Sequence, residues 1–296
     1  MLNNIYVTKG LVMNFRKTMI FFSLALAVSV TLRTLMIFFT TEASSGFFKK
    51  GYEVFSYGMM VIIISAILLC IVFAAKCSRP KAPAFLNTVN TFVSVLLGLS
   101  IGTEALFVDY SGSAMPWQNL LQTIFGVLSC VVFMWLGIYF SGLVPAPGIF
   151  LIIPAVFFLF RIIVVFITYS GVSTIADNVF ELASLCASLI FMMQYAKIQN
   201  SVNTEKTNAK VLPTALAACL IIFTQVIPII IAMLSENDAL IHSSSLYIPS
   251  CLFMGIFILC TSVFRIKDIP PSKFFYTPRH DGAGLSVQDL ILNADE

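Results

Sequence analysis

The chain has 296 residues, of which 59% are apolar and only 10% are charged, and its mean hydropathy is +0.96. About a quarter of the residues in a soluble domain are charged, so this composition excludes an ordinary soluble protein and makes lipid the solvent for most of the chain. The net charge of +3 is small and the basic residues are dispersed, so we expect no nucleic-acid partner.

Eight apolar stretches are long enough to cross the hydrocarbon core of a bilayer, which takes about 20 helical residues. They cover residues 18–41, 54–75, 88–108, 119–142, 149–170, 178–197, 212–234 and 246–264. The linkers between them are short and leave no room for a soluble domain. We therefore expect an all-α, polytopic membrane protein with eight transmembrane helices in contact with the lipid bilayer.

The first apolar stretch follows Arg16 and Lys17, as the apolar core of a signal peptide would. It is too long for such a core and has no small-residue cleavage site, so we expect a first span that is retained. The sequence leaves both Met1 and Met13 open as the start of translation, because residues 1–12 show no helical periodicity.

The positions of the basic residues predict the orientation in the membrane. Every Lys and Arg other than Arg33, Lys49, Lys50 and Arg161 lies before the first span or at or after the end of the second, sixth or eighth. Since cytoplasmic loops carry the excess of Lys and Arg, both termini should be cytoplasmic. The expected location is the plasma (cytoplasmic) membrane.

The same pair of charges occurs twice in the chain. Arg33 and Glu53 are 20 residues apart, as are Arg161 and Glu181, and the second pair follows the first by 128 residues. This spacing predicts two similar halves of four helices each. Four crossings return the chain to its starting side, so the halves should be related by an axis along the membrane normal.

The predicted organisation then has four parts. These are a cytoplasmic N-terminal segment (1–17), a first transmembrane half (18–142), a second transmembrane half (149–264) and a cytoplasmic tail (265–296).

An arginine deep in a bilayer costs on the order of 3 kcal/mol if nothing compensates its charge. Arg33 and Arg161 each lie about eight residues, or roughly 12 Å, before the outer end of their helix. We expect each to pair with a glutamate of the following helix, Glu53 or Glu181. For Glu53 this requires the second helix to begin near Phe47. The pairs either contribute to a ligand site or only fix the register between consecutive helices.

Further polar residues are candidates for an outward-facing vestibule. They are Thr40, Tyr57, Glu104, Thr168, Ser184 and Gln225. Helical spacing places the threonines on the faces of the arginines, and Tyr57 and Ser184 on the faces of the glutamates. Glu104 either lines the vestibule or contacts interfacial water. Gln225, three residues before Pro228, either lines a pathway or makes an interhelical hydrogen bond.

Two more features of the spans predict packing rather than chemistry. Ser94, Gly98 and Gly102 recur every four residues, which permits close approach of a neighbouring helix. Tyr247 falls at a predicted outer end, as an aromatic-belt residue would. The seven cysteines lack metal-ligand spacing and are expected to be small buried hydrophobes.

The sequence lacks the usual constellations of an enzyme. His242 and His280 are the two histidines, in a predicted loop and in the tail, and no HExxH motif or Gly-rich phosphate loop occurs. We therefore expect no catalysis, no cofactor and no metal site.

The leading functional hypothesis is a small-solute carrier or membrane receptor. Its outward vestibule would hold a small anionic or zwitterionic ligand at Arg33 and Arg161, with Glu53 and Glu181 orienting the arginines. The alternative is a non-catalytic membrane subunit or sensor that docks a protein partner through its cytoplasmic tail.

Overall fold

The computed structural model describes residues 15–42, 49–77, 86–107, 116–169, 175–200, 204–235 and 247–263. In chain order the helices are α1 (Phe15–Leu35), η1 (Met36–Thr40, a π-helix), α2 (Glu53–Ala75), α3 (Leu86–Phe107), α4 (Pro116–Phe140), η2 (Gly148–Leu151, a 3₁₀ turn), α5 (Ile152–Tyr169), α6 (Ile175–Gln199), α7 (Thr204–Leu234) and α8 (Tyr247–Ser262). The predicted all-α class is confirmed for these residues.

Seven of the helices in the described ranges are long and apolar enough to cross a membrane, which supports a multi-pass membrane protein. The eighth, α8, is apolar but has only 16 residues. At 1.5 Å per residue it is about 24 Å long, shorter than the roughly 30 Å hydrocarbon core. The largest boundary difference is in α7, which begins at Thr204 rather than near residue 212.

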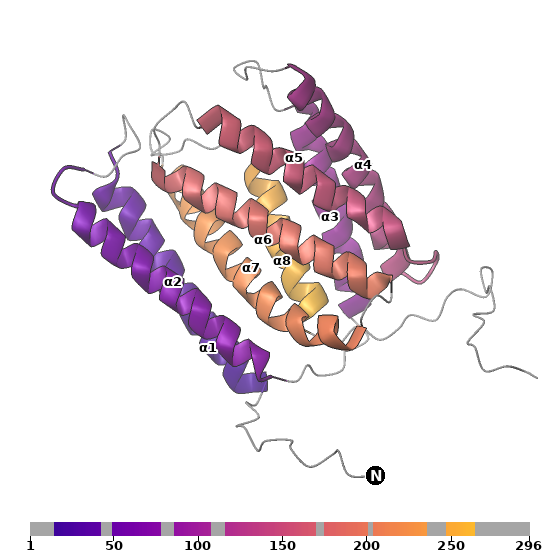
Figure 1. Ribbon diagram of the computed structural model, residues 1–296, viewed down its shortest axis with the longest axis horizontal. Helices are drawn as coiled ribbons and strands as arrows, with labels where there is room; N and C mark the ends of the chain where they lie inside the picture. The colour runs from indigo at the N-terminus through magenta and orange to yellow at the C-terminus, as the bar shows by residue number, and fades with distance from the viewer. Residues whose placement is uncertain are drawn as a thin grey trace, which may run out of the picture.

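The helices form one bundle with two hairpins at its edges (Figure 1). α1 and α2 pack together at one edge and both contact α7, while α3 and α4 form the pair at the other edge. Between them, α5 packs on α4 and α6, and α6 packs on α7. The short α8 packs on α3 and α7, which links the second edge to the centre of the bundle.

Glycines bring α3 and α4 unusually close. A Cβ atom added to Gly98 would lie 3.0 Å from the Cys130 carbonyl oxygen, and one added to Gly126 would lie 2.4 Å from the Ala105 Cβ. Gly102 likewise faces the Cys130 side chain. The close approach predicted from the four-residue spacing of Gly98 and Gly102 is therefore confirmed, with α4 as the neighbour.

The packing gives the predicted repeat no support. In a repeat, α1–α4 would correspond to α5–α8, so the packing of α6 on α7 should have a counterpart between α2 and α3. The main helix contacts among the described residues include no such pair, and α1 packs on α7 without an equivalent contact of α5 on α3. The repeat of two four-helix halves stays a prediction, as does the orientation in the membrane.

Several predicted features lie outside the described residues. They are both candidate start positions (Met1 and Met13), His242 and the whole cytoplasmic tail at 265–296 with His280.

Candidate functional site

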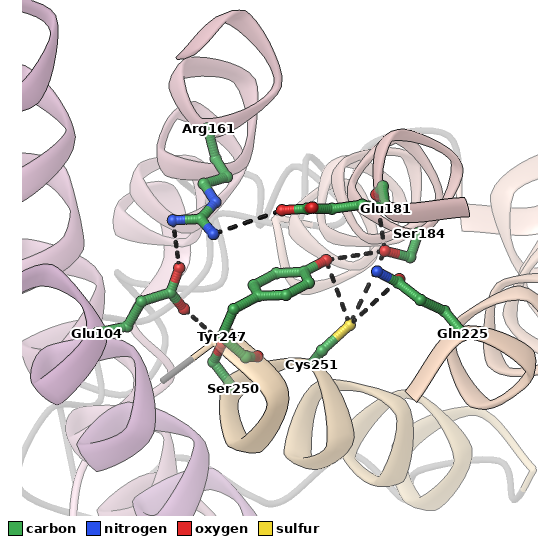
Figure 2. Close-up of polar contacts among 8 residues, drawn as sticks. All are labelled: Glu104, Arg161, Glu181, Ser184, Gln225, Tyr247, Ser250 and Cys251. Atoms are coloured by element: carbon green, nitrogen blue, oxygen red, sulfur yellow. Dashed lines mark hydrogen bonds and ion pairs between the residues drawn. The ribbon is translucent and has the colours of Figure 1, made fainter. Parts of the chain in front are cut away.

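The side chain of Arg161 joins three helices inside the bundle. It lies on α5, is only 5% exposed, and its Nη1 atom is 2.6 Å from Oε1 of Glu104 on α3. Its Nη2 atom is 3.5 Å from Oε1 of Glu181 on α6. Figure 2 shows the guanidinium between the two carboxylates. Since both glutamates are buried, two acidic groups and one basic group share a low-dielectric interior.

Helix ends explain why these residues meet. Glu104 lies three residues before the end of α3, Glu181 lies six residues into α6, and Tyr247 is the first residue of α8. Arg161 lies in the second half of α5. Successive helices run in opposite directions, so the end of α3 and α5 and the beginning of α6 and α8 fall at the same end of the bundle.

The residues around Arg161 form what we call the polar cluster. Its members are Glu104, Arg161, Glu181, Ser184, Gln225, Tyr247, Ser250 and Cys251.

Tyr247 supports the cluster with both its ring and its hydroxyl group. The guanidinium carbon of Arg161 lies 4.8 Å from the centre of the Tyr247 ring, a cation–π contact. The Tyr247 hydroxyl is 2.9 Å from Ser184 Oγ. Ser184 donates its one hydroxyl proton to the Glu181 backbone carbonyl at 2.8 Å, so Tyr247 is the donor in the bond to Ser184.

Two further residues of α8 complete the network. Ser250 makes a short hydrogen bond with Oε2 of Glu104, and its hydroxyl also lies 2.8 Å from the Tyr247 carbonyl oxygen. The Cys251 thiol lies 3.4 Å from the Tyr247 hydroxyl and 3.9 Å from Oε1 of Gln225. α8 thus connects the carboxylate of α3 with the amide of α7 (Figure 2).

A small cavity adjoins the ion pairs. Its volume of about 10 Å³ leaves room for about one water molecule. The walls combine polar groups of the cluster and Ser188 with the apolar side chains of Phe157, Phe158, Leu185 and Met254. The site is therefore buried within the bundle rather than lining a wide vestibule.

The two predicted Arg–Glu pairs differ in the structure. Arg161 pairs with Glu181 as expected, and Arg33 is buried, at 2% exposure. Glu53, however, is exposed, and within the described ranges the structure records no ion pair between Glu53 and Arg33. The reason is that α2 begins at Glu53 itself, so that residue does not descend into the bundle. The Arg33 guanidinium instead stacks 4.3 Å from the centre of the Phe180 ring.

The residues predicted beside the first pair also lie outside the cluster. Tyr57 is 58% exposed on α2 and does not line the cavity beside Arg161, so its place in a vestibule stays a prediction. Thr40 is buried, but its hydroxyl donates to the Met36 carbonyl within the π-helix at 2.8 Å. The side chain of Thr168 lies outside the described residues.

Three other predicted residues are members of the polar cluster. Glu104 is 2% exposed, so it lies inside the bundle and not at a wet interface. Ser184 is fully buried between Glu181 and Tyr247. Gln225 is buried, and its side-chain oxygen contacts the Cys251 thiol of α8. This contact agrees with the interpretation of Gln225 as a residue that makes an interhelical hydrogen bond.

The sequence does not predict the contribution of α8 to the polar cluster. It favours an aromatic-belt position for Tyr247 and an apolar-core position for Cys251, but both are buried in the polar cluster together with Ser250. The available signal was the polar residue Ser250 at the start of the last apolar stretch. Among the described residues, no group of three or more His, Cys, Asp and Glu side chains is placed to hold a metal ion.

Comparison with models of known protein families, with curated proteins and with solved structures finds no match to this chain.

Proposed function

We propose that the protein is a multi-pass membrane carrier for a small zwitterionic solute, which binds at the polar cluster. The observation that supports this is the buried guanidinium of Arg161 held between Glu104 and Glu181, next to a cavity inside the bundle. Ionisable groups inside a membrane bundle are costly and usually mark a ligand or ion pathway.

The charges of the cluster favour a zwitterion over a simple anion. Arg161 already faces two carboxylates, so an anion that approached it would be repelled by Glu104 and Glu181. A zwitterion can place its carboxylate on Arg161 and its ammonium group on a glutamate, so that each charge keeps an opposite partner. The Tyr247 ring offers a further surface for a cationic group.

Arg33 is not part of this proposed binding site. Its guanidinium lies over Phe180, and neither Arg33 nor Phe180 lines the cavity. In the sequence-based hypothesis both arginines hold the ligand, whereas the binding site proposed here contains Arg161 alone.

Admission of a solute requires the cavity to widen. It has room for about one water molecule, and its apolar walls come from α5, α6 and α8. Separation of these helices is the movement that a carrier would use to open the site. A receptor with the same site would bind the solute but would not move it across the membrane.

The test combines binding and uptake. Thermal stabilisation of the purified protein is measured with the zwitterions glycine and betaine, the anion acetate and the cation methylammonium, and uptake of the stabilising solute is then measured in proteoliposomes. We expect a zwitterion to stabilise the wild type. Glu181→Gln and Arg161→Lys should lower the apparent affinity at least tenfold, because the first removes a charge and the second a planar, two-pronged donor.

Glu53→Gln is the matched control, because Glu53 is an exposed glutamate on α2 and is not a member of the cluster. It should behave as the wild type does. Stabilisation by acetate alone, or equal affinity in wild type and in both cluster variants, would contradict the proposed site. Binding without uptake would replace the carrier with a receptor.

A further inference from the structure

The hydroxyl group of Ser250 faces two acceptors and has one proton. It lies 2.8 Å from the Tyr247 backbone carbonyl, which can only accept, and it makes its short contact with Oε2 of Glu104. If Ser250 donates to the carbonyl, the hydrogen bond to Glu104 needs a proton on the carboxyl group. If Glu104 is ionised, Ser250 donates to it instead. Rotation of a single hydroxyl therefore serves both forms of Glu104.

The single positive charge of Arg161 does not balance the two carboxylates beside it when both are ionised. Glu104 and Glu181 are both within 3.5 Å of Arg161, and all three side chains are buried. With both carboxyl groups ionised, these three residues carry one net negative charge in a low-dielectric interior. One proton bound by a carboxyl group removes this imbalance.

Among the side chains that the structure describes, the neighbouring elements contribute few other ionisable groups. α8 presents the Tyr247 hydroxyl and the Cys251 thiol, and α4 presents the thiol of Cys130, which lies against Gly102. From α1, Arg33 stacks on Phe180, the residue before Glu181. Because the Ser250 hydroxyl can bond Glu104 in either protonation state, Glu104 is the better position for a proton.

The cavity can hold a water molecule next to Glu104, from which a proton can be transferred. Glu104 and Ser250 both line it, and it has room for about one water molecule. Oε1 of Glu104 has an ion contact with Arg161 but accepts no directed hydrogen bond from any described residue. A water molecule in the cavity can donate to this oxygen.

We propose that Glu104 takes up and releases one proton, and that this proton is the coupling ion of the carrier. In the protonated form Glu104 donates to Ser250, Ser250 donates to the Tyr247 carbonyl, and Arg161 is left with Glu181 as its ionised partner. In the deprotonated form Ser250 donates to Glu104, and Arg161 faces two carboxylates. The only bond made or broken is one O–H bond, and the proton comes from water and returns to it.

The coupling rests on the proposed function, but proton binding does not require a solute. We would therefore record infrared difference spectra of the full-length protein in lipid nanodiscs, without solute, as the pH is stepped. We expect a carboxylic-acid C=O band that grows on acidification and is absent in Glu104→Gln, a variant with the shape of the protonated acid. Ser250→Ala should keep this band but shift it, because the acid loses its hydrogen-bond acceptor.

Glu53→Gln is the control and should keep the whole band. A band that persists in Glu104→Gln, or that disappears only in Glu181→Gln, would overturn the assignment to Glu104. Absence of any pH-dependent band in the wild type would do the same. A missing band with normal zwitterion binding removes the proton site and leaves the carrier, whereas a normal band without solute binding or uptake removes the carrier.

Discussion

Tyr247 stabilises the surroundings of Arg161 in two separable ways. Its ring lies under the guanidinium, and its hydroxyl donates to Ser184, which in turn is bonded to the backbone of Glu181. Both interactions are buried, so neither competes directly with bulk water. A pair of substitutions at one position can therefore measure them separately.

Tyr247→Phe keeps the ring and removes the hydroxyl. We expect it to lower the free energy of unfolding by about 1 kcal/mol, the usual net value of one buried hydrogen bond. Tyr247→Leu should cost a further ~1–2 kcal/mol, because the cation–π contact is lost as well. Reversible unfolding in mixed detergent micelles measures both values. Equal losses in the two variants would show that the ring contact with Arg161 contributes nothing.

At the residue level, the sequence shows which side chains are anomalous but not how they are grouped. A charge inside an apolar stretch is visible in the sequence, and this feature marks Arg33, Glu104, Arg161 and Glu181. That Arg161 would contact Glu104, 57 residues earlier in the chain, depends on how α3 and α5 pack, and no local pattern reports that contact.

Among the helices, the close packing of α3 on α4 depends on small residues. The Gly126 Cα lies so close to α3 that an added Cβ would be 2.4 Å from the Ala105 Cβ and 3.2 Å from the Phe157 ring. Phe157 in turn lines the cavity beside Arg161. The spacing of these two helices therefore helps to set the geometry of the polar cluster.

Gly126→Ala should push α4 away from α3 and destabilise the protein by about 1–3 kcal/mol, as overpacking of a tight contact does. Gly58→Ala on α2 is the matched control, because a Cβ there meets nothing within 4 Å. That variant should be neutral or slightly stabilising, since alanine favours a helix more than glycine does. Thermal unfolding of the two variants side by side makes the comparison. A neutral Gly126→Ala would contradict the close contact.

At the level of the helices, the prediction that Glu53 pairs with Arg33 depended on where α2 begins. The eight long apolar helices of the described residues, seven of them long enough to cross a membrane, followed from apolar length, which is a strong signal. The observed start of α2 at Glu53 agrees with the apolar stretch from residue 54, so the condition for the first Arg–Glu pair, a start near Phe47, is not met. A shift of about six residues, from Phe47 to Glu53, separates a buried carboxylate from an exposed one.

For the whole molecule, the equal spacing of the two Arg–Glu pairs predicts two similar halves, but the structure gives the two arginines different surroundings. Arg161 is at the centre of a network that includes α3, α5, α6 and α8, whereas Arg33 stacks on an aromatic ring near the edge formed by α1 and α2. Apolar helices resemble one another in composition, so matched spacing of two charges does not require matched packing. The membrane-protein class could be read from the sequence, while the single polar centre could not.

A double-mutant cycle tests this central claim most directly. At a pH at which Glu104 is ionised in the wild type, reversible unfolding in mixed micelles is measured for Arg161→Met, Glu104→Gln and the double variant, and in parallel for Arg33→Met, Glu53→Gln and their double variant. The structure predicts a coupling of at least ~1 kcal/mol between Arg161 and Glu104, whose charged atoms lie 2.6 Å apart. It predicts additive effects for Arg33 and Glu53. Additivity at Arg161 and Glu104, or strong coupling between Arg33 and Glu53, would contradict the account.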